Sequence, residues 1–474
     1  MVLSLARFFA VHMSAANITT HLSTGDVLMR TLCLSLIIGL IVTSHSAASQ
    51  PEWRVGTART DITPSGPIWM GGYASRNHPS EGVLQPIWAK ALLFEDPAGS
   101  RAAIVTLDLI GIDRGLTDSV CQRICQKTGI PRERIVLNCS HTHSGPVVAG
   151  VTPLVYDLDA GQQKTVDDYA KTLADKLVLL VEAAVKDLQP AKLAFGEGQA
   201  TFGANRRAMR VKVPEGAPKP PAPVDHTVPV LTVRDEKDAL RAVLFGYACH
   251  STTLAIYEIN GDYPGFAQAA LETSHPGVTA LFMAGCGADV NPNPRSEVAL
   301  AKQHGQSLAA AVDTVLGGTL RPLRGPLAVG FERVDLKFVA PPNKEQLEKL
   351  LQDKNKYQQR LAKHLLGELA AGRALPTSYP CPVQVLRFGN DLVMVALAGE
   401  VCVDYALRLR REFAGRPIMI ASFCNEIFSY IPTERVLSEG GYEGGAAMVY
   451  FGIHGPFQPG LEQQIIDTVK RLAK

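Results

Sequence analysis

The chain has 474 residues, of which 46% are hydrophobic and 19% are charged, and its 47 basic and 45 acidic side chains give a formal net charge of +2. This length can bury a large core in one big domain or two, and the composition is ordinary for a folded soluble protein. Because the near-neutral charge comes without a basic stripe or a Lys/Arg block, the sequence argues against a nucleic-acid-binding protein.

The N-terminal segment has the pattern of a secretion signal. Arg30 precedes an apolar run over 32–42, and small residues follow at 46–48. A basic residue, a short apolar stretch and a small-residue cleavage site are typical of a signal peptide, and this run is too short to span a bilayer comfortably. We therefore expect a signal peptide over residues 1–48, with Met29 as an alternative start. The mature protein would then be periplasmic or secreted.

The first half of the chain alternates between strand and helix patterns. Strands are expected over 53–62, 87–94 and 102–110, a further strand with the apolar run 135–137 should end in the pair His141 and His143, and helices are expected over 116–128 and 166–188. The longer helix has apolar residues at helical spacing. This order predicts a layered α/β core. The proline-rich segment 213–229 is expected to be a loop or lid rather than a strand.

The second half continues the same alternation. Strands are expected over 240–249 and 279–284, a hairpin over 383–388 and 392–397, and helices over 297–316, 401–413 and 461–472. The charged stretch 343–371 predicts one long helix or a helical hairpin at the surface. No repeat and no break between two cores is evident. The predicted fold is therefore a mixed-sheet α/β core with helices packed outside, in a single catalytic domain over 50–474.

Nine cysteines occur in the chain, one of them within the signal segment. Export permits disulfides. Four cysteines nevertheless lie in apolar surroundings within a few residues of candidate site residues: Cys139, Cys249, Cys286 and Cys402. We interpret these as small buried fillers rather than bridges.

Two histidines, His141 and His143, follow the apolar run 135–137 and precede a Ser-Gly-Pro turn. In an extended chain, residues i and i+2 point to the same face, so both imidazoles should project together at a strand end. Imidazoles placed side by side can hold a transition metal or move protons. The alternative is a pair of turn histidines that merely form hydrogen bonds.

Further metal-ligand types follow other predicted strands. His250 ends the strand 240–249, Glu400 follows the strand 392–397, and glycines surround Tyr442. Sites in open α/β sheets form outside the carboxyl ends of strands, and two imidazoles with one carboxylate make a catalytic zinc set. Alternatively, His250 is a core histidine, Glu400 caps the following helix and Tyr442 is a packing residue.

Several segments, taken together, resemble the catalytic domain of neutral, non-lysosomal ceramidases. The most specific is Ser-His-Thr-His-Ser-Gly-Pro at 140–146. Weaker segments occur in the family's order at 54–56, 61–63, 205–206, 261–265, 289–293 and 442–445. The resemblance runs from about Arg54 to near Gly460. Members of this family are zinc amidases that cleave the N-acyl bond of ceramide into sphingosine and a fatty acid.

The resemblance implies specific roles for this chain's residues. Zn²⁺ would be held by His141, His250, Glu400 and Tyr442. His143 and Arg206 would lie beside the metal. His143 could then carry a proton to the leaving amine, and Arg206 could stabilise an oxyanion.

Asn291 stands where the family has its nucleophilic serine. An amide is a poor nucleophile, so an acyl-enzyme on this residue is not expected. Three explanations stay open: a metal-activated water with His143 or Asp289 as base, Cys286 as a substitute nucleophile, or a relative with another substrate or no activity. Asn291 could still donate a hydrogen bond to an oxyanion.

We also expect no C-terminal immunoglobulin-like domain of the kind that ceramidases carry. The predicted function is zinc-dependent hydrolysis of an amide bond, with a lipid or another small amide as substrate and peripheral contact with a membrane. The alternatives are a non-catalytic, zinc-containing protein that binds lipid or glycan, and an amidase or deacetylase with a non-ceramide substrate.

Overall fold

The computed structural model describes residues 53–210 and 222–474. The expected signal peptide and residues 213–221 of the expected lid lie outside the described residues. None of the helices described is long and apolar enough to cross a membrane.

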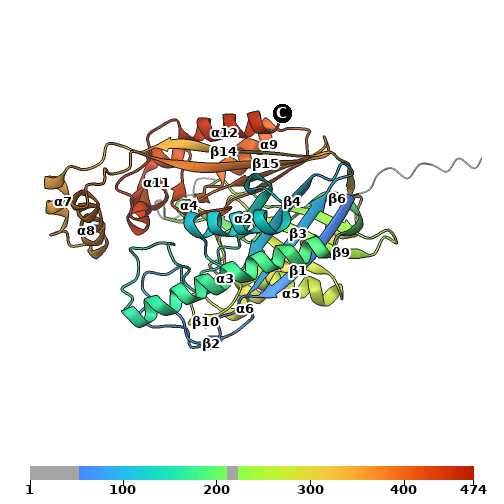
Figure 1. Cartoon of the computed structure of the whole chain (residues 1–474), viewed down its shortest axis with the longest axis horizontal. Coiled ribbons are helices and arrows are strands. Elements are labelled where there is room, and N and C mark those ends of the chain that lie inside the picture. The colour runs from blue at the N-terminus through green and yellow to red at the C-terminus, as the bar shows by residue number, and fades with distance from the viewer. Residues whose placement is uncertain (1–52, 211–221) are drawn as a thin grey trace, which may run out of the picture. The chain divides into compact units, whose positions relative to one another are not determined.

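A nine-stranded mixed sheet lies at the centre of the fold (Figure 1). Its strand order is β11-β9-β8-β6-β1-β3-β4-β5, with β13 paired to β6. The strands are β1 Trp53–Asp61, β3 Trp88–Glu95, β4 Arg101–Leu107, β5 Ile135–Cys139, β6 Gln189–Gln199, β8 Thr227–Arg234, β9 Leu240–Tyr247, β11 Thr279–Ala284 and β13 Arg321–Leu323. The pairs β4–β5 and β9–β11, at opposite edges, are parallel. The other pairs are antiparallel.

A second, four-stranded sheet packs face to face against the first. It comprises β14 Leu327–Lys337, β15 Ser378–Phe388, β16 Leu392–Leu397 and β18 Ile418–Ala421, in that order. One apolar cluster joins the two sheets, with Val55 and Leu244 from the larger one and Phe388 and Met394 from the smaller. Because strand residues alternate between faces, each sheet presents a second apolar face on the opposite side.

Helices cover both outer faces. The outer face of the large sheet packs against α2 Arg114–Thr128, α3 Ala160–Lys186, α5 Asp262–Ser274 and α6 Val298–Leu316. The outer face of the small sheet packs against α9 Asp404–Glu412 and α12 Leu461–Leu472. Asp159 and Gln162 form a capping box that starts α3, whose buried residues recur at helical spacing. The result is a helix–sheet–sheet–helix sandwich (Figure 1).

The remaining elements are short or peripheral. Helices α7 Lys344–Leu350 and α8 Lys356–Ala370 form a hairpin, as one of the two alternatives for this stretch predicted. The others are β2 Gly82–Val83, η1 Arg132–Arg134, β7 Gly203–Asn205, α4 Arg206–Arg210, β10 Glu258–Ile259, β12 Val290–Pro292, β17 Glu400–Val401, β19 Tyr430–Ile431, α10 Glu434–Glu439, α11 Gly441–Gly444 and η2 Ala446–Phe451.

The layered α/β prediction is confirmed, with local corrections. The expected loop over 213–229 is wrong at its end, because β8 begins at Thr227. Val228 and Val230 are buried in the core, and their burial outweighs the backbone donor that Pro229 lacks. The helix expected from residue 401 begins at Asp404, because Glu400 and Val401 instead pair with Tyr430 and Ile431.

One buried side chain ties the two edges of the large sheet together. Asn138 of β5 accepts a hydrogen bond from the Ala284 N–H of β11 (3.0 Å) and donates one to the Ser422 carbonyl, just after β18 (2.6 Å). Asn138 is fully buried. Strand ends from both sheets therefore meet at one place.

We expect Asn138→Ala to destabilise the fold by about 2–4 kcal/mol, because two buried backbone groups would lose their partner. Urea unfolding should show a lower midpoint for this variant. The exposed Asn390→Ala is the control and should change stability by less than about 0.5 kcal/mol. Equal midpoints for the two variants would contradict this role of Asn138.

Candidate metal centre

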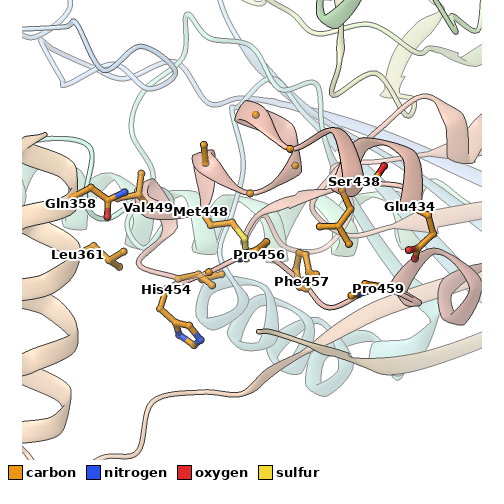
Figure 2. Close-up of a pocket in the computed structure, with 18 residues that line it drawn as sticks. Gln358, Leu361, Glu434, Ser438, Met448, Val449, His454, Pro456, Phe457 and Pro459 are labelled. Atoms are coloured by element: carbon orange, nitrogen blue, oxygen red, sulfur yellow. The ribbon is translucent and has the colours of Figure 1, made fainter. Parts of the chain in front are cut away.

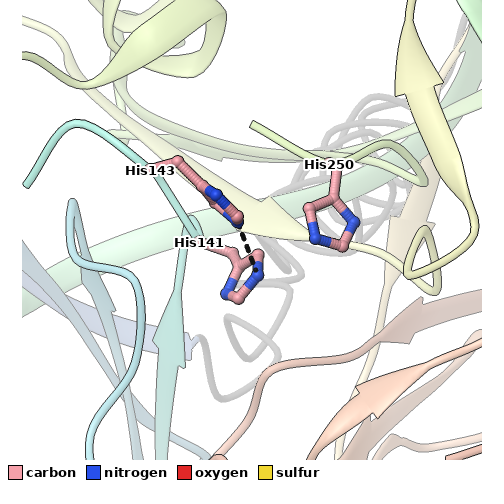
Figure 3. Close-up of side chains that lie close together, drawn as sticks. All are labelled: His141, His143 and His250. Carbon is pink, nitrogen blue, oxygen red and sulfur yellow. Dashed lines mark hydrogen bonds between the residues drawn. The ribbon is translucent and has the colours of Figure 1, made fainter. Parts of the chain in front are cut away.

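Three buried histidines converge where the strand ends meet (Figure 3). His141 and His143 follow β5, and His250 follows β9. One ring nitrogen from each lies within 4.8 Å of the others. His141 adopts a left-handed backbone conformation (φ 59°), so a tight turn rather than an extended strand brings His141 and His143 together. Their Nε2 atoms are 3.2 Å apart.

Glu400 completes the group from a separate two-stranded sheet, β17–β19. It begins β17, which pairs in parallel with β19, and its side chain is buried. Its Oε2 atom lies 3.3 Å from His141 Nε2 and 3.4 Å from His250 Nε2. Two imidazoles and one carboxylate, from strands distant in sequence, therefore face a common point.

Backbone carbonyls set the tautomer of both imidazoles. His141 Nδ1 lies 2.5 Å from the Ile110 carbonyl, and His250 Nδ1 lies 3.1 Å from the Gly287 carbonyl. A carbonyl oxygen accepts but cannot donate, so each Nδ1 carries a proton and each neutral ring has a lone pair on Nε2. The tautomers thus follow from the hydrogen-bond partners.

Both Nε2 atoms face a carboxylate oxygen, and His141 Nε2 also faces His143 Nε2 at 3.2 Å. Within the described part of the chain, His250 Nε2 and Glu400 Oε2 are buried without a hydrogen-bond partner. Buried acceptors that face one another are costly, and a shared cation removes this cost. Imidazole nitrogen and carboxylate oxygen suit zinc and related transition metals, and a carbonyl on the second ring nitrogen is the usual support for such ligands. The residues therefore fit a metal ion.

The surroundings also favour the protonation states that a metal needs. Burial and the charge of Arg206 lower the pKa of His250 to about 4, despite the nearby Glu400. Burial, with the neighbouring histidines, lowers the pKa of His143. Burial alone would raise the pKa of Glu400, but positive charge at His141 and His250 holds it well below its ordinary value, and a bound cation supplies positive charge at the same place when the rings are neutral. His143 and His250 are therefore neutral and Glu400 is ionised at neutral pH.

Arg206 lies beside this group at the start of α4. Its guanidinium donates to Glu443 (2.7 Å) and to the Tyr430 hydroxyl (3.1 Å). A third N–H approaches Asn291 Oδ1 at 3.4 Å. Burial alone would lower the pKa of Arg206, but Tyr430 and Glu443 raise it above its ordinary value. Arg206 therefore places a fixed positive charge next to the histidines.

The pairing of β7 with β12 brings Asn291 to Arg206. Asn291 Oδ1 faces both Arg206 and the Thr252 hydroxyl (3.5 Å). Since these two donors approach the oxygen, the Asn291 NH₂ group keeps its donor capacity.

Asp289 has a different position. Its carboxylate accepts hydrogen bonds from Asn205 Nδ2 (2.9 Å) and the Val403 N–H (2.8 Å), and its backbone carbonyl accepts from the Arg206 N–H. Burial raises the pKa of Asp289. Both carboxylate oxygens thus hold β7 and the residues after β17 in place, which makes Asp289 a support for Arg206 rather than a neighbour of the histidines.

Two tyrosines extend the group outward. The Tyr442 ring, 36% exposed, packs edge-on against Tyr430 at 5.3 Å between centroids, and the Arg206 guanidinium lies 5.7 Å from each ring. Tyr430 is buried, stacks parallel to the His250 ring at 6.5 Å, and hydrogen-bonds to Glu400 as well as Arg206. Tyr430 is thus nearer than Tyr442 to the carboxylate.

Sequence reasoning missed Tyr430 and Glu443. Tyr430 stands in an apolar stretch with no motif around it, so it carries no local signal. Glu443 does carry one, because it follows Tyr442 in the Tyr-Glu-Gly-Gly segment and can pair with the Asn-Arg segment. Its carboxylate, which is buried, bridges Arg206 and Arg207 at 2.7 Å each.

The eight cysteines of the described residues are free thiols, and seven of them are buried. This confirms the prediction of buried fillers. Cys286 belongs to the apolar cluster under the smaller sheet, and burial raises its pKa well above the ordinary value. A protonated thiol in that position is a poor substitute nucleophile.

Residues 53–329 match the family model described as neutral/alkaline non-lysosomal ceramidase, N-terminal. The chain belongs to this family. The three histidines of the metal centre, Arg206 and Asn291 lie inside the matched region. Beyond it lie Glu400 and Tyr430, on the two-stranded sheet β17–β19, and Tyr442, on α11.

Individual ceramidases are similar to this family member over different lengths. The neutral ceramidase of Pseudomonas aeruginosa is 25% identical, with coverage of 92% of this chain and 74% of that protein. Neutral ceramidase A of Dictyostelium discoideum is 27% identical, with coverage of 52% of this chain and 36% of that protein. The fold resembles that of a solved ceramidase complexed with C2 (TM-score 0.69, 21% identity, 90% of this chain and 75% of that one). The solved Pseudomonas aeruginosa neutral ceramidase gives a TM-score of 0.68.

We expect Glu443→Ala to lower the free energy of unfolding by about 3–5 kcal/mol, because the buried Arg206 charge would lose its carboxylate partner. The control is Glu439→Ala, which removes a more exposed partner of Arg207 and should cost no more than about 1 kcal/mol. Chemical denaturation of both variants checks this. A loss for Glu443→Ala as small as that of the control would show that the Arg206–Glu443 pair does not stabilise the fold.

Proposed function

We propose that this protein is a zinc-dependent amidohydrolase that acts on a lipid amide of the ceramide type, releasing a fatty acid and a sphingoid amine. The observation that carries the proposal is the convergence of His141 Nε2, His250 Nε2 and Glu400 Oε2, whose lone pairs face one another in a buried site. Family membership supports an amide as the bond that is cleaved.

A zinc ion in such a site polarises a carbonyl and lowers the pKa of water. His141, His250 and Glu400 would hold it, with a tyrosine hydroxyl as a further ligand. The sequence resemblance favours Tyr442 for that ligand. The hydrogen bond between Tyr430 and Glu400 favours Tyr430 instead, which leaves the more exposed Tyr442 to face the substrate.

His143 is suited to move the proton in this reaction. Burial keeps its imidazole neutral, so it can accept a proton and pass it to the leaving amine. Tyr73 packs edge-on against the ring at 5.0 Å. Gly72 lies so close that a Cβ there would be 2.5 Å from His143 Cγ. Close packing on the ring thus holds His143 in one orientation.

Arg206 and Asn291 are suited to stabilise negative charge on the carbonyl oxygen. Arg206 is held by Glu443 and Tyr430, and Asn291 keeps an N–H donor beside it. Fixed donors of this kind favour the transition state more than the ground state. Because Asn291 cannot attack, water supplies the nucleophilic oxygen: it adds to the carbonyl carbon, the C–N bond breaks, and the amine nitrogen takes the proton from His143.

A binding protein without turnover is the second candidate, and Asn291 at the position of the family serine favours it. An amidase or deacetylase with another substrate is the third. Hydrolysis of a short-chain fluorescent ceramide by the zinc-loaded protein supports the first proposal. Zinc binding with no hydrolysis across amide and ester panels supports the second, and cleavage of other amides alone supports the third.

We expect His250→Ala and Glu400→Ala to lose the bound metal and all hydrolysis, because each removes a ligand. Asn291→Ala should keep about one metal per chain and lose about 10²–10³-fold in rate, since it removes only a donor to the oxyanion. Metal analysis of the purified variants, with His275→Ala as a partly exposed histidine control, checks this. A metal-free Asn291→Ala protein would contradict the assignment.

We expect Tyr430→Phe to weaken metal affinity about tenfold, because it removes the hydroxyl hydrogen-bonded to Glu400. Tyr442→Phe should leave metal affinity unchanged. Competition with a chromogenic chelator measures both. The reverse pattern would identify Tyr442 as the tyrosine ligand, as the sequence resemblance implies.

We further propose that the protein is exported, on the basis of the signal pattern before residue 48. N-terminal sequencing of the protein recovered outside the cytoplasm should begin near residue 50. A mature chain that still carried Met29 would refute the proposed cleavage.

A further inference from the structure

A cavity lies beside the short helix α11, which carries Tyr442. It has a volume of about 590 Å³ and lies between α8, α10 and the segment 446–459 (Figure 2). Its walls are mainly apolar and include Leu361, Leu437, Met448, Val449, Ile453 and Phe457. None of the histidines of the metal centre lines it. Its volume falls within the usual range for small-molecule pockets.

Glycines form the wall shared by this cavity and the metal centre. Gly441 and Gly444 line the cavity from α11, where their i, i+3 spacing places them on one side of the turn, and Gly445 lines it directly after this helix. Tyr442 and Glu443, between them, contact Tyr430 and Arg206. Gly444 and Gly445 are packed closely against the protein, since a Cβ would lie 2.7 Å from the Val436 carbonyl oxygen and 2.9 Å from Pro456 Cβ, respectively.

Several polar groups around the cavity already have protein partners. Glu434 accepts a hydrogen bond from the Gly460 N–H (2.7 Å), and the Ser438 hydroxyl donates to the Arg435 carbonyl (2.9 Å). His454 Nε2 faces the Val339 carbonyl (3.3 Å). Within the described residues, His454 Nδ1 has no hydrogen-bond partner, and the rest of the surface offered to a ligand is mainly aliphatic and aromatic carbon. Such a lining favours an amphiphile with an unbranched apolar group over a sugar or a peptide.

We propose that this cavity binds one hydrocarbon chain of an amphiphile. The cavity shares its glycine wall with the turn that carries Tyr442 and Glu443, so a bound chain packs directly behind the residues that position Arg206. The proposal rests on the proposed function for the source of the chain, which is either the lipid amide itself or a separate amphiphile such as a fatty acid.

Binding is tested with the metal-loaded full chain and a fluorescent conjugated-polyene fatty acid, displaced by saturated fatty acids of increasing length. Affinity should rise about two- to fourfold per added methylene, as expected for burial of a hydrocarbon chain. Ser438→Trp and Ala446→Trp each place a large ring in the cavity from an exposed position and should weaken binding at least about tenfold. Ser438→Ala and Ala446→Ser leave the space open and should bind as the unaltered protein does.

Equal affinity in the tryptophan variants and their controls, or affinity independent of chain length, would overturn the proposal. The source of the chain follows from kinetics with a long-chain ceramide and its acetyl counterpart. A KM raised by Ser438→Trp for the long chain alone identifies the substrate's own chain, and KM values unchanged for both identify a separate amphiphile.

These measurements separate this proposal from the proposed function. If the unaltered protein hydrolyses neither amide, the hydrolase assignment fails, whereas the displacement experiment still decides whether the cavity binds a chain. If both amides are hydrolysed and no fatty acid displaces the probe from the cavity, the function stands and the cavity proposal fails.

Discussion

The site depends on one electrostatic constraint: His250 Nε2 and Glu400 Oε2 face each other in a buried place without a hydrogen-bond partner in the described residues, and His141 Nε2 lies beside them. The Ile110 and Gly287 carbonyls enforce this arrangement, since they hold the proton of each ring on Nδ1. Without a cation the arrangement is costly, because each group has lost its water. When a cation is bound, the same buried nitrogen and oxygen atoms coordinate it, so metal binding removes this cost and stabilises the folded protein. The left-handed backbone conformation of His141, which is unusual for a residue other than glycine, occurs at this same site.

The residues of the site come from separate parts of the two-sheet fold. The large sheet supplies the histidines, while Glu400 and Tyr430 arrive on a short parallel pair of strands beyond the smaller sheet. Asn138 joins these parts directly, and Asp289 joins the residues after β17 to the turn before Arg206. The charge of the buried Arg206 is likewise balanced by a residue from a distant segment, because Arg206 forms an ion pair with Glu443. Neither sheet alone contains a complete site.

Much of the fold and of the candidate site could be predicted from the sequence, because the patterns that indicate them lie within short segments of the chain. His141, His143, His250 and Glu400 could be predicted as site residues because each follows a predicted strand. Helix α3 could be predicted because its apolar residues recur at helical spacing. What could not be predicted depends on contacts between distant segments. Tyr430 has no motif around it and is placed by the pairing of β19 with β17. The sequence offers Asp289 as an alternative base to His143, whereas only tertiary contacts show that its carboxylate accepts hydrogen bonds from Asn205 and Val403. β8 was hidden by prolines whose cost the buried valines outweigh.

The most direct test of the account is X-ray absorption at the edge of the metal bound to the purified protein. A metal held by His141, His250 and Glu400 should show nitrogen and oxygen neighbours only, with the multiple scattering of about two imidazole rings and no sulfur shell. The Glu400→Gln variant should bind the metal more weakly because it lacks the carboxylate ligand, and its spectrum should still show the scattering of the imidazole rings. A sulfur neighbour, or a spectrum without imidazole scattering, would place the metal elsewhere and contradict the central claim.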